Sequence, residues 1–471
     1  MNSKSALTLL NRLANRQPEQ VLLLERAFRR RLDQLAEIIL EVAVETGDPA
    51  GNVMAARVQE EGLSRDTVKR VLDKLGSEVY RSSVPLREIG LAATRTALEQ
   101  WQDLDAPPLD DRIQVLNNLG FWLRASGDPE SALCTVEQAV ELSQRQTTSR
   151  ASRQTARNLH SLATLLADLE QREKALEVME EAVRIDRQLA ASDTELEIEL
   201  VSSLQNLGTM YWSLSRFKEA LATTQEAVTR NRKLAPDSKD RSLPLLANGL
   251  HNLGTILDDL SQRERALKAL EEAVEIRRTL AEAHEHSFKP DLASSLHNLA
   301  IVLASMHRRE ESIKVLEEVL RVREELARSR PAPFEPGLAR TLSVLGNRLR
   351  ELGRCGEGLP YSQRAVDLYR RLVEIHEGLF QDDLAASLNN LSLVLGGLDR
   401  HEDSLRAAEE AVAIYRRLTT DTPGVFDAEL FRSLDTLAKI LRRLNRLDLA
   451  EAALEEKTAA VGRSSRRIHE R

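Results

Sequence analysis

The stretch SLHNLAIVLASMHRREESIKVLEEVLRVREELA, residues 295–327, decides the fold of this chain because its pattern recurs along the sequence. The third residue of its Asn-Leu-Ala triplet is Ala300, and we call each such position a marker. The markers are Gly120, Ala163, Gly208, Gly254, Ala300, Gly346, Ser392 and Ala438. They are spaced 43, 45 and then five times 46 positions apart. A fixed period over eight units indicates a stacked repeat array.

The residues around each marker predict a pair of helices. Leu stands four positions and one position before every marker, and Leu or Tyr stands three positions after it, which is one face of a helix. We therefore expect Leu253 to be buried between the two helices of its own unit. Twelve positions after each marker a second small residue occurs: Ala132, Ala175, Ala220, Ala266, Ser312, Gly358, Ser404 and Ala450. Small residues at facing positions let antiparallel helices approach closely, so each unit is predicted to be a helix hairpin.

This arrangement of Leu and small residues resembles the tetratricopeptide repeat, in which small side chains at these offsets interlock paired helices. The period of 46 exceeds the usual length of about 34 residues. In this respect the units are similar to the lengthened repeats of kinesin light chains and of bacterial signalling proteins. HEAT-like repeats have a comparable length, but they do not explain the paired small positions.

The resemblance implies an all-α fold, a right-handed α-solenoid of helix hairpins. We expect an N-terminal helical domain at 1–102, eight repeats at 103–458 and a basic flexible tail at 459–471. Lys457 replaces a small residue in the last unit, so its second helix is expected to cap the array. The connections between units carry an aromatic ladder, which should pack between neighbouring hairpins: Phe288, Phe334, Phe380 and Phe426.

The helix face opposite the Leu positions should form the inner, concave surface of the array. It is polar and weakly charged. The candidate residues for binding a peptide or protein segment are Asn117, Asn118, Gln205, Asn206, Thr209, His251, Asn252, Thr255, His297, Asn298, Asn389 and Asn390. Asn and Gln carry a donor and an acceptor, so a row of them can bind the peptide bonds of an extended partner. The same side chains could instead join adjacent first helices, and the sequence leaves both interpretations open.

Charge is unevenly distributed along this face. Acidic residues lie in the earlier repeats, at Asp168, Asp258 and Asp259. Basic residues lie in the last three repeats, at Arg340, Arg350, Arg432 and Lys439. An acidic or carboxylate-bearing segment would prefer that basic end. The alternative is a charged face that only contacts solvent.

The first 102 residues lack a clear repeat. Residues 56–72 resemble the helix-turn-helix of bacterial regulators, with Gly62 at the turn, Ser64 as the cap and Val68 at the buried position of the recognition helix. A rival interpretation takes Gly76 as the marker of a degenerate ninth repeat. Acidic side chains nearby would repel phosphates: Glu60, Glu61, Asp66 and Asp73. We therefore expect a helical capping or partner-docking domain, and no nucleic acid partner.

Composition excludes several classes of protein. The net charge of −8 argues against a globally basic nucleic-acid binder. The two cysteines, Cys134 and Cys355, have no neighbours that would complete a zinc site, and they favour a reducing, cytoplasmic compartment. No apolar run is long enough to span a membrane. The nine histidines are scattered and no phosphate-binding, dinucleotide-binding, zinc-protease or serine-hydrolase motif occurs, so we expect no enzyme activity, cofactor or metal.

The predicted function is therefore a non-enzymatic scaffold or sensor that binds a peptide or protein segment in the concave groove. The family resemblance implies a place in a bacterial signalling or defence complex. Two alternatives remain: a peptide-sensing transcription regulator with an N-terminal helix-turn-helix, and the sensor subunit of an enzyme complex. The sequence leaves the oligomeric state open.

Overall fold

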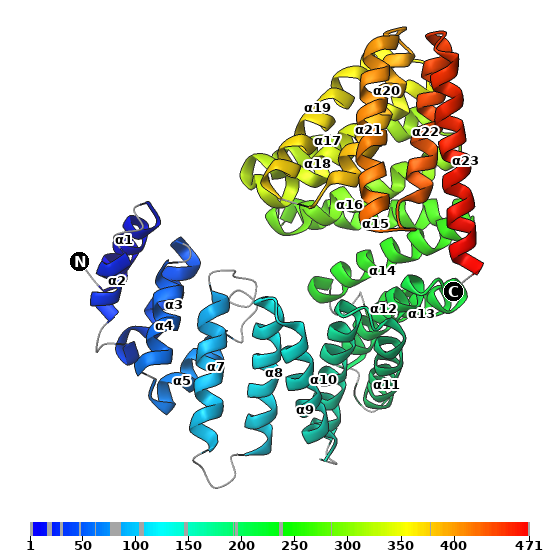
Figure 1. Cartoon of the computed structure of the whole chain (residues 1–471). Helices are drawn as coiled ribbons and strands as arrows, with labels where there is room; N and C mark the ends of the chain where they lie inside the picture. Colours follow the sequence, from blue (N-terminus) through cyan, green and yellow to red (C-terminus); the bar gives the residue numbers. More distant parts are fainter. Residues whose placement is uncertain are drawn as a thin grey trace. The chain divides into compact units, whose positions relative to one another are not determined.

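The regular elements of the chain are α-helices, as the repeat pattern predicts. A computed structural model describes residues 3–16, 21–28, 32–46, 49–61, 63–75, 86–102, 108–145, 149–191, 193, 196–234, 239–283, 285–376 and 378–469. Figure 1 shows these helices coloured along the chain. Within the described ranges, none of them combines the length and the hydropathy that crossing a membrane requires.

The chain divides into two compact units, Met1–Leu234 and Ala235–Arg471. The helices of unit 1 are α1 (Ser3–Arg16), α2 (Val21–Phe28), α3 (Leu32–Thr46), α4 (Pro49–Glu61), α5 (Arg65–Leu75), α7 (Arg87–Gln102), α8 (Leu109–Ala125), α9 (Pro129–Gln144), α10 (Ser149–Asp168), α11 (Arg172–Ala190), α12 (Glu197–Ser213) and α13 (Phe217–Leu234). The helices of unit 2 are α14 (Lys239–Asp259), α15 (Arg263–Ala283), α16 (Glu285–Ser305), α17 (Arg309–Ser329), α18 (Pro331–Glu351), α19 (Cys355–Ile375), α20 (Gln381–Gly396), α21 (His401–Asp421), α22 (Asp427–Arg443) and α23 (Leu447–His469).

Each predicted repeat is a helix hairpin. The pairs are α8 with α9, α10 with α11 and α12 with α13 in unit 1, and α14 with α15 through α22 with α23 in unit 2. Within each unit, the second helix of one pair packs on the first helix of the next pair. In unit 2, the first helices α18, α20 and α22 also contact one another in succession. Each unit is therefore a solenoid of stacked hairpins, which confirms the predicted fold class (Figure 1).

The small residues allow the two helices of a hairpin to approach closely. A Cβ atom added to the marker Gly254 would lie 2.5 Å from Cγ of Leu270 on the second helix. The small residues twelve positions after the markers are buried in all eight repeats. Leu250, four positions before the marker, is only 1% exposed. Leu253 is only partly buried, so the expectation that it lies fully inside the hairpin was wrong, and Leu250 holds that place.

A left-handed residue separates the two helices of every hairpin. Seven positions after each marker φ is positive, at Gly127, Glu170, Ser215, Ser261, His307, Gly353, Asp399 and Asn445. In the repeat of α14, Ser261 N–H donates to the Asp258 carbonyl at 2.8 Å and Gln262 N–H donates to the Leu257 carbonyl at 2.8 Å. This is the Schellman motif, which satisfies the last carbonyls of the first helix. Six of the eight residues are not Gly, so the sequence does not reveal the motif.

The aromatic ladder is only partly in connecting segments. Phe288 lies within α16 and Phe334 within α18, whereas Phe380 and Phe426 directly precede α20 and α22. The expectation that all four lie in connections was therefore wrong. In α18 the physical reason is Pro331 at the first helical position, where proline is preorganised for a helix, so the helix starts before the aromatic residue. All four side chains are partly buried, and Phe380 and Phe426 pack against the core of unit 2.

In the described part of the chain, the helices before the first repeat, α1 to α5 and α7, share their core with the repeats. One hydrophobic cluster runs from Leu7 in α1 through Trp122 in α8 to Ala227 in α13. Helix α7 packs on α4, α5 and α8, and a Cβ atom at Gly90 would clash with the Trp122 ring. The division into compact units falls after Leu234 instead of at residue 102. The N-terminal helices thus continue the stacking of the first three repeats.

The turn before α5 and the end of α23 refine two further predictions. Ser64 precedes α5 and donates from its N–H and Oγ to Asp33 at 2.9 and 3.0 Å, while Val68 is buried. Gly62 and Gly76 lie outside the described residues. Helix α23 continues to His469, so the segment expected as a flexible tail from 459 is helical up to that residue. Its Lys457 donates to Asp435 at 2.8 Å.

Candidate functional site

Polar side chains meet where one repeat packs on the next. We call each meeting point a junction cluster. It combines three residues: the one three positions before a marker, on the first helix, the one 23 positions after that marker, on the second helix, and the one five positions before the next marker, on the first helix of the following repeat. In unit 1 one such cluster is His160, Asp186 and Ser203. In unit 2 the clusters are His251 with Arg277 and Ser295, His297 with Arg323 and Thr341, Ser343 with Tyr369 and Ser387, and Asn389 with Tyr415 and Ser433.

The unit 1 cluster has the composition of a serine-hydrolase triad but a different geometry. Ser203 Oγ lies 2.7 Å from Nε2 of His160 and donates to Oδ2 of Asp186 at 2.6 Å. Asp186 also contacts Nε2 of His160, at 3.1 Å. In a catalytic triad the hydroxyl and the carboxylate use different ring nitrogens. Because both groups share one nitrogen and Ser203 is buried, this cluster is a contact between repeats.

In the two junction clusters of unit 2 that contain a histidine, an arginine occupies the position of Asp186. Arg277 donates to the Asp291 carbonyl at 2.8 Å and to Asn248 Oδ1 at 2.7 Å, and Ser295 Oγ lies 3.0 Å from Nδ1 of His251. Burial, together with the charge of Arg277, lowers the pKa of His251 to about 4. The imidazole is therefore neutral at pH 7.

The cluster of His297 is also positively charged. Arg323 donates to the Gly337 carbonyl at 2.6 Å and to Oγ1 of Thr341, and burial followed by the charge of Arg340 lowers its pKa to about 10. Burial lowers the pKa of His297 to about 4, with further contributions from Arg323, Arg340 and Arg348. A neutral His297 thus lies among cationic neighbours.

Some residues of the predicted binding row connect first helices. Asn298 Nδ2 donates to Thr255 Oγ1 of the preceding repeat at 3.1 Å. Asn390 Nδ2 donates to Ser343 Oγ of the preceding repeat at 3.1 Å, and Asn117 Nδ2 donates to Asn158 Oδ1 of the following repeat at 2.7 Å. These bonds correspond to the structural interpretation of the row.

The other members of the row differ in exposure. Asn206 and Thr209 are exposed, whereas Asn118 and Gln205 are buried. The partly buried members are Asn117, His251, Asn252, Thr255, His297, Asn298, Asn389 and Asn390. The row is therefore not one uniformly open surface.

The last junction cluster differs from the others because it opens into a pocket. Asn389 Oδ1 and Ser433 Oγ are buried and have no hydrogen-bond partner in the described part of the chain. The residues Asn389 and Ser433 line a cavity of about 460 Å³ between α20 and α22, with Tyr415 of α21. Its lining residues are Asp382, Asp383, Ala386, Asn389, Asn390, Tyr415, Val425, Phe426, Glu429, Arg432 and Ser433. We call this cavity the α20–α22 pocket.

The α20–α22 pocket is acidic. Three of its lining residues carry carboxylates, and its one cationic residue, Arg432, is bonded to Glu429 at 2.6 Å. The Tyr415 hydroxyl donates to the Asp382 carbonyl at 3.3 Å. Burial raises the pKa of Tyr415 above its ordinary value, and the charges of Glu429 and Asp382 raise it further. Burial and the neighbouring Asp382 raise the pKa of Asp383.

The predicted basic end is not one continuous cationic surface. Arg432 lies among the carboxylates of the α20–α22 pocket. Arg350 Nε donates to Asn347 at 3.0 Å, and Arg340 and Lys439 are exposed. The sequence prediction treated these four residues together because it counted charges along one helix register, without the acidic residues that the preceding repeat brings to Arg432.

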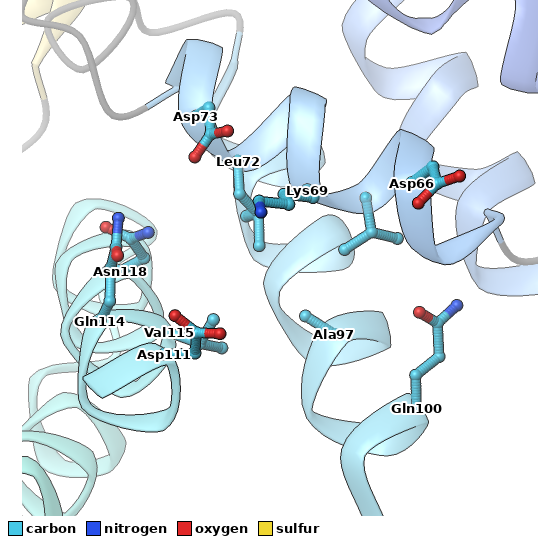
Figure 2. Close-up of a pocket in the computed structure, with 11 residues that line it drawn as sticks. Asp66, Lys69, Leu72, Asp73, Ala97, Gln100, Asp111, Gln114, Val115 and Asn118 are labelled. Carbon is cyan, nitrogen blue, oxygen red and sulfur yellow. The ribbon is translucent and has the colours of Figure 1, made fainter. Parts of the chain in front are cut away.

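A second cavity, of about 230 Å³, lies in unit 1 between α5, α7 and α8. Figure 2 shows the lining side chains, which come from α5, α7 and α8. Its polar lining is Asp66, Lys69, Asp73, Gln100, Asp111, Gln114 and Asn118, and its apolar lining is Val68, Leu72, Ala97 and Val115. Sequence reasoning missed this cavity because its walls come from three helices, two of which carry no repeat pattern.

The basic residues of α5 face acidic partners. Arg70 is bonded to Glu37 at 2.9 Å and Lys74 to Glu41 at 2.7 Å, both on α3. Lys69 lines the unit 1 cavity together with three carboxylates. A recognition helix needs free cations toward the phosphates of DNA, so these contacts argue against a DNA-reading role. The side chain of Arg65 lies outside the described residues.

Comparisons with known proteins agree with the repeat register. Tetratricopeptide-repeat family models match residues 156–189, 200–238, 246–287, 291–371 and 384–419. The apo form of RapI matches with a TM-score of 0.58 at 13% identity, covering 85% of this chain and 98% of that chain. BtubC from P. vanneervenii matches with a TM-score of 0.43 at 21% identity, covering 51% of this chain and 92% of that chain. No curated protein sequence matches the chain.

The likeness to RapI shows a shared helical repeat fold. Among the described residues, no group of three or more His, Cys, Asp or Glu side chains could hold a metal ion. The features that remain for function are the polar surface of the first helices and the cavities of the two units.

Proposed function

The chain is a tetratricopeptide-repeat protein, and we propose that it is a cytoplasmic protein-interaction scaffold that binds an extended segment of a partner protein on the first helices of unit 2. Repeat arrays of this family bind other proteins, and the groove between successive first helices is a suitable surface for an extended chain. The proposed centre of the site is the α20–α22 pocket.

The observation that carries this proposal is the pair of unbonded polar atoms in that pocket. At the preceding junction, Ser387 Oγ donates to Ser343 Oγ at 3.2 Å. At the last junction, the corresponding Ser433 and Asn389 are lining residues of a cavity, and their buried Oγ and Oδ1 atoms have no partner among the described residues. A buried polar atom without a hydrogen bond costs about 1–3 kcal/mol. Hydrogen-bond donors of a bound segment would satisfy both oxygens.

The proposed contacts use part of the predicted row. Asn389 and Asn390 both line the α20–α22 pocket, and Asn390 retains its amide oxygen while Nδ2 bonds to Ser343. Asn298 and His251 are assigned to contacts between repeats instead. The transcription-regulator alternative is not proposed, because Lys69, Arg70 and Lys74 of α5 all lie beside carboxylates.

The test is capture of the partner by the full-length chain from a lysate of the source cell, followed by titration of overlapping peptides from the recovered protein. We expect the double variant Asn389→Ala with Ser433→Ala to bind the best peptide about tenfold more weakly, because two hydrogen bonds are lost. Its melting temperature should not fall, since both replaced atoms are unbonded in the free protein.

The matched control is Ser387→Ala, which makes the same change at the same register one repeat earlier. Ser387 is bonded to Ser343, so this variant should lose stability and keep its affinity for the peptide. An unchanged affinity in the Asn389 and Ser433 double variant would refute the proposed site.

A further inference from the structure

We infer that the α20–α22 pocket accepts a cationic group, the guanidinium of an arginine side chain in the bound segment. The inference rests on the proposed function and adds the chemical class of the partner. It reverses, for this pocket, the expectation of an acidic ligand at the C-terminal repeats.

The pocket is built from one face of α20 and the first turns of α22. On α20, Asp382, Asp383, Ala386, Asn389 and Asn390 follow helical spacing toward the cavity. Glu429 and Arg432 line it from α22, and the buried Tyr415 lines it from α21. With three carboxylates and one guanidinium, the lining carries a formal charge of −2. A cation would be attracted and an acidic group repelled.

A second observation, independent of charge, also indicates a donor ligand. Ser433, a lining residue of the cavity, is only 1% exposed, and its buried Oγ has no hydrogen-bond partner among the described residues. Asn389 Oδ1, which can only accept a hydrogen bond, is also buried without a partner among the described residues. Guanidinium has five N–H donors and no acceptor, so it can satisfy these oxygens and a carboxylate together.

The apolar part of the lining fits the stem of an arginine side chain. Phe426 and Tyr415 are the aromatic residues of the pocket, and Val425 at its edge is 65% exposed. Methylene groups pack on such surfaces while the charged head reaches polar groups, and guanidinium stacks on aromatic rings. A small polyamine would supply charge as well, but it would leave the peptide-binding oxygens of the row unused.

The elevated pKa of Asp383 agrees with this assignment. Burial and Asp382 disfavour its charged form in the free protein, while Arg340 and the Tyr369 hydroxyl favour it. A bound guanidinium would favour the ionised carboxylate and so lower this pKa again.

The probes are three acetylated and amidated pentapeptides, Ala-Ala-Xaa-Ala-Ala, in which Xaa is arginine, citrulline or glutamate, and the free amine agmatine. Each is titrated into the full-length chain and followed by saturation-transfer NMR. We expect the arginine peptide to bind, the citrulline peptide to bind at least tenfold more weakly and the glutamate peptide not to bind. Raising NaCl from 50 to 500 mM should weaken the arginine complex. Agmatine binding as tightly as the arginine peptide would refute a peptide as the source of the cation.

Two variants locate the site. Asp382→Asn with Glu429→Gln should weaken the arginine peptide at least tenfold, whereas Glu409→Gln, an exposed carboxylate on α21 outside the pocket, should not change it. Ser433→Ala should also weaken binding without lowering the melting temperature. Equal affinity for arginine and citrulline, absence of arginine binding, or wild-type affinity in the carboxylate variant would overturn the inference. If the captured partner still binds that variant with wild-type affinity, the scaffold function stands and only the cationic assignment fails.

Discussion

The residue three positions before the marker is polar in all eight repeats, yet its neighbours differ. His160 lies beside the carboxylate of Asp186, His251 beside Arg277, and Asn389 beside an open pocket. The repeat pattern therefore places a polar atom at each junction, and the surrounding residues, from the second helix of the same repeat and from the next repeat, decide whether that atom stabilises the array or is available to a ligand.

The left-handed turn residue provides a test at this scale. His307 has φ near 60°, a conformation that costs a residue with Cβ about 1 kcal/mol relative to Gly. We expect His307→Gly to raise the free energy of unfolding by up to about 1 kcal/mol, measured by chemical denaturation. The reverse change at the same position of the next repeat, Gly353→Ala with φ near 74°, should lower it by a similar amount. Destabilisation by His307→Gly would contradict the turn geometry.

At the scale of the helices, the first helix of each repeat has two functions. Its Leu side packs into the hairpin, and its opposite side joins the first helices of neighbouring repeats through polar bonds. In unit 2, α14 and α16 are linked in this way by Asn298 and Thr255, and α18 and α20 by Asn390 and Ser343. A side chain that connects helices cannot be removed without a loss of stability, whereas an exposed one can.

The variants Asn298→Ala and Asn206→Ala compare a side chain that connects two first helices with one that is exposed. Asn298 donates to Thr255 at 3.1 Å, so its truncation should cost about 1 kcal/mol of unfolding free energy. Asn206, at the same register in unit 1, is exposed, and its truncation should change stability by less than about 0.5 kcal/mol. Chemical denaturation of the two variants measures the difference. Equal losses would mean that the bond between the first helices contributes nothing.

At the scale of the whole molecule, stability depends on how the repeats share their buried groups. In unit 1, a large hydrophobic cluster joins the N-terminal helices to the first three repeats. Unit 2 contains the neutral imidazoles of His251, beside the buried Arg277, and of His297, beside the partly buried Arg323. Since these groups lie between repeats, protonating them should weaken the stacking of several hairpins together.

The pH dependence of unfolding tests this. The pKa values of His251 and His297 fall from about 6.5 to about 4 in the folded chain. Between these pH values the unfolded state binds more protons, so stability is complete above pH 6.5 and decreases as the pH falls toward 4. One pKa unit corresponds to about 1.4 kcal/mol, which gives roughly 3 kcal/mol for each histidine.

The measurement is the denaturation midpoint of unit 2 from pH 4 to 7. The double variant His251→Gln with His297→Gln should lose less stability on acidification, while His307→Gln, on an exposed turn, should follow the wild type. If the double variant loses stability on acidification as steeply as the wild type, groups other than these two histidines cause the loss.

The hairpins were predictable from sequence because each is defined by residues within one period. Leu and small side chains at fixed offsets specify which faces of two helices meet, and the close approach of Gly254 to Leu270 follows from that pattern. The turn residues were not predictable in the same way, because Glu, Ser, His, Asp and Asn all occupy the left-handed position and only two are Gly. Hydrogen bonds of the backbone, which do not depend on the side chain, impose that conformation.

The candidate site was predictable only in its register. The sequence alone determined an all-α repeat array and a polar row on its first helices, because both depend on local periodicity. Tertiary structure decided which members of that row are bonded, since Ser433, which lines the pocket with Asn389, and Ser343, which accepts from Asn390, belong to other repeats. It also decided the sign of the charge around Arg432, where Asp382 and Asp383 approach from the preceding repeat. Electrostatic interactions act through space, so a charge count along one helix could not reveal an acidic pocket formed by two.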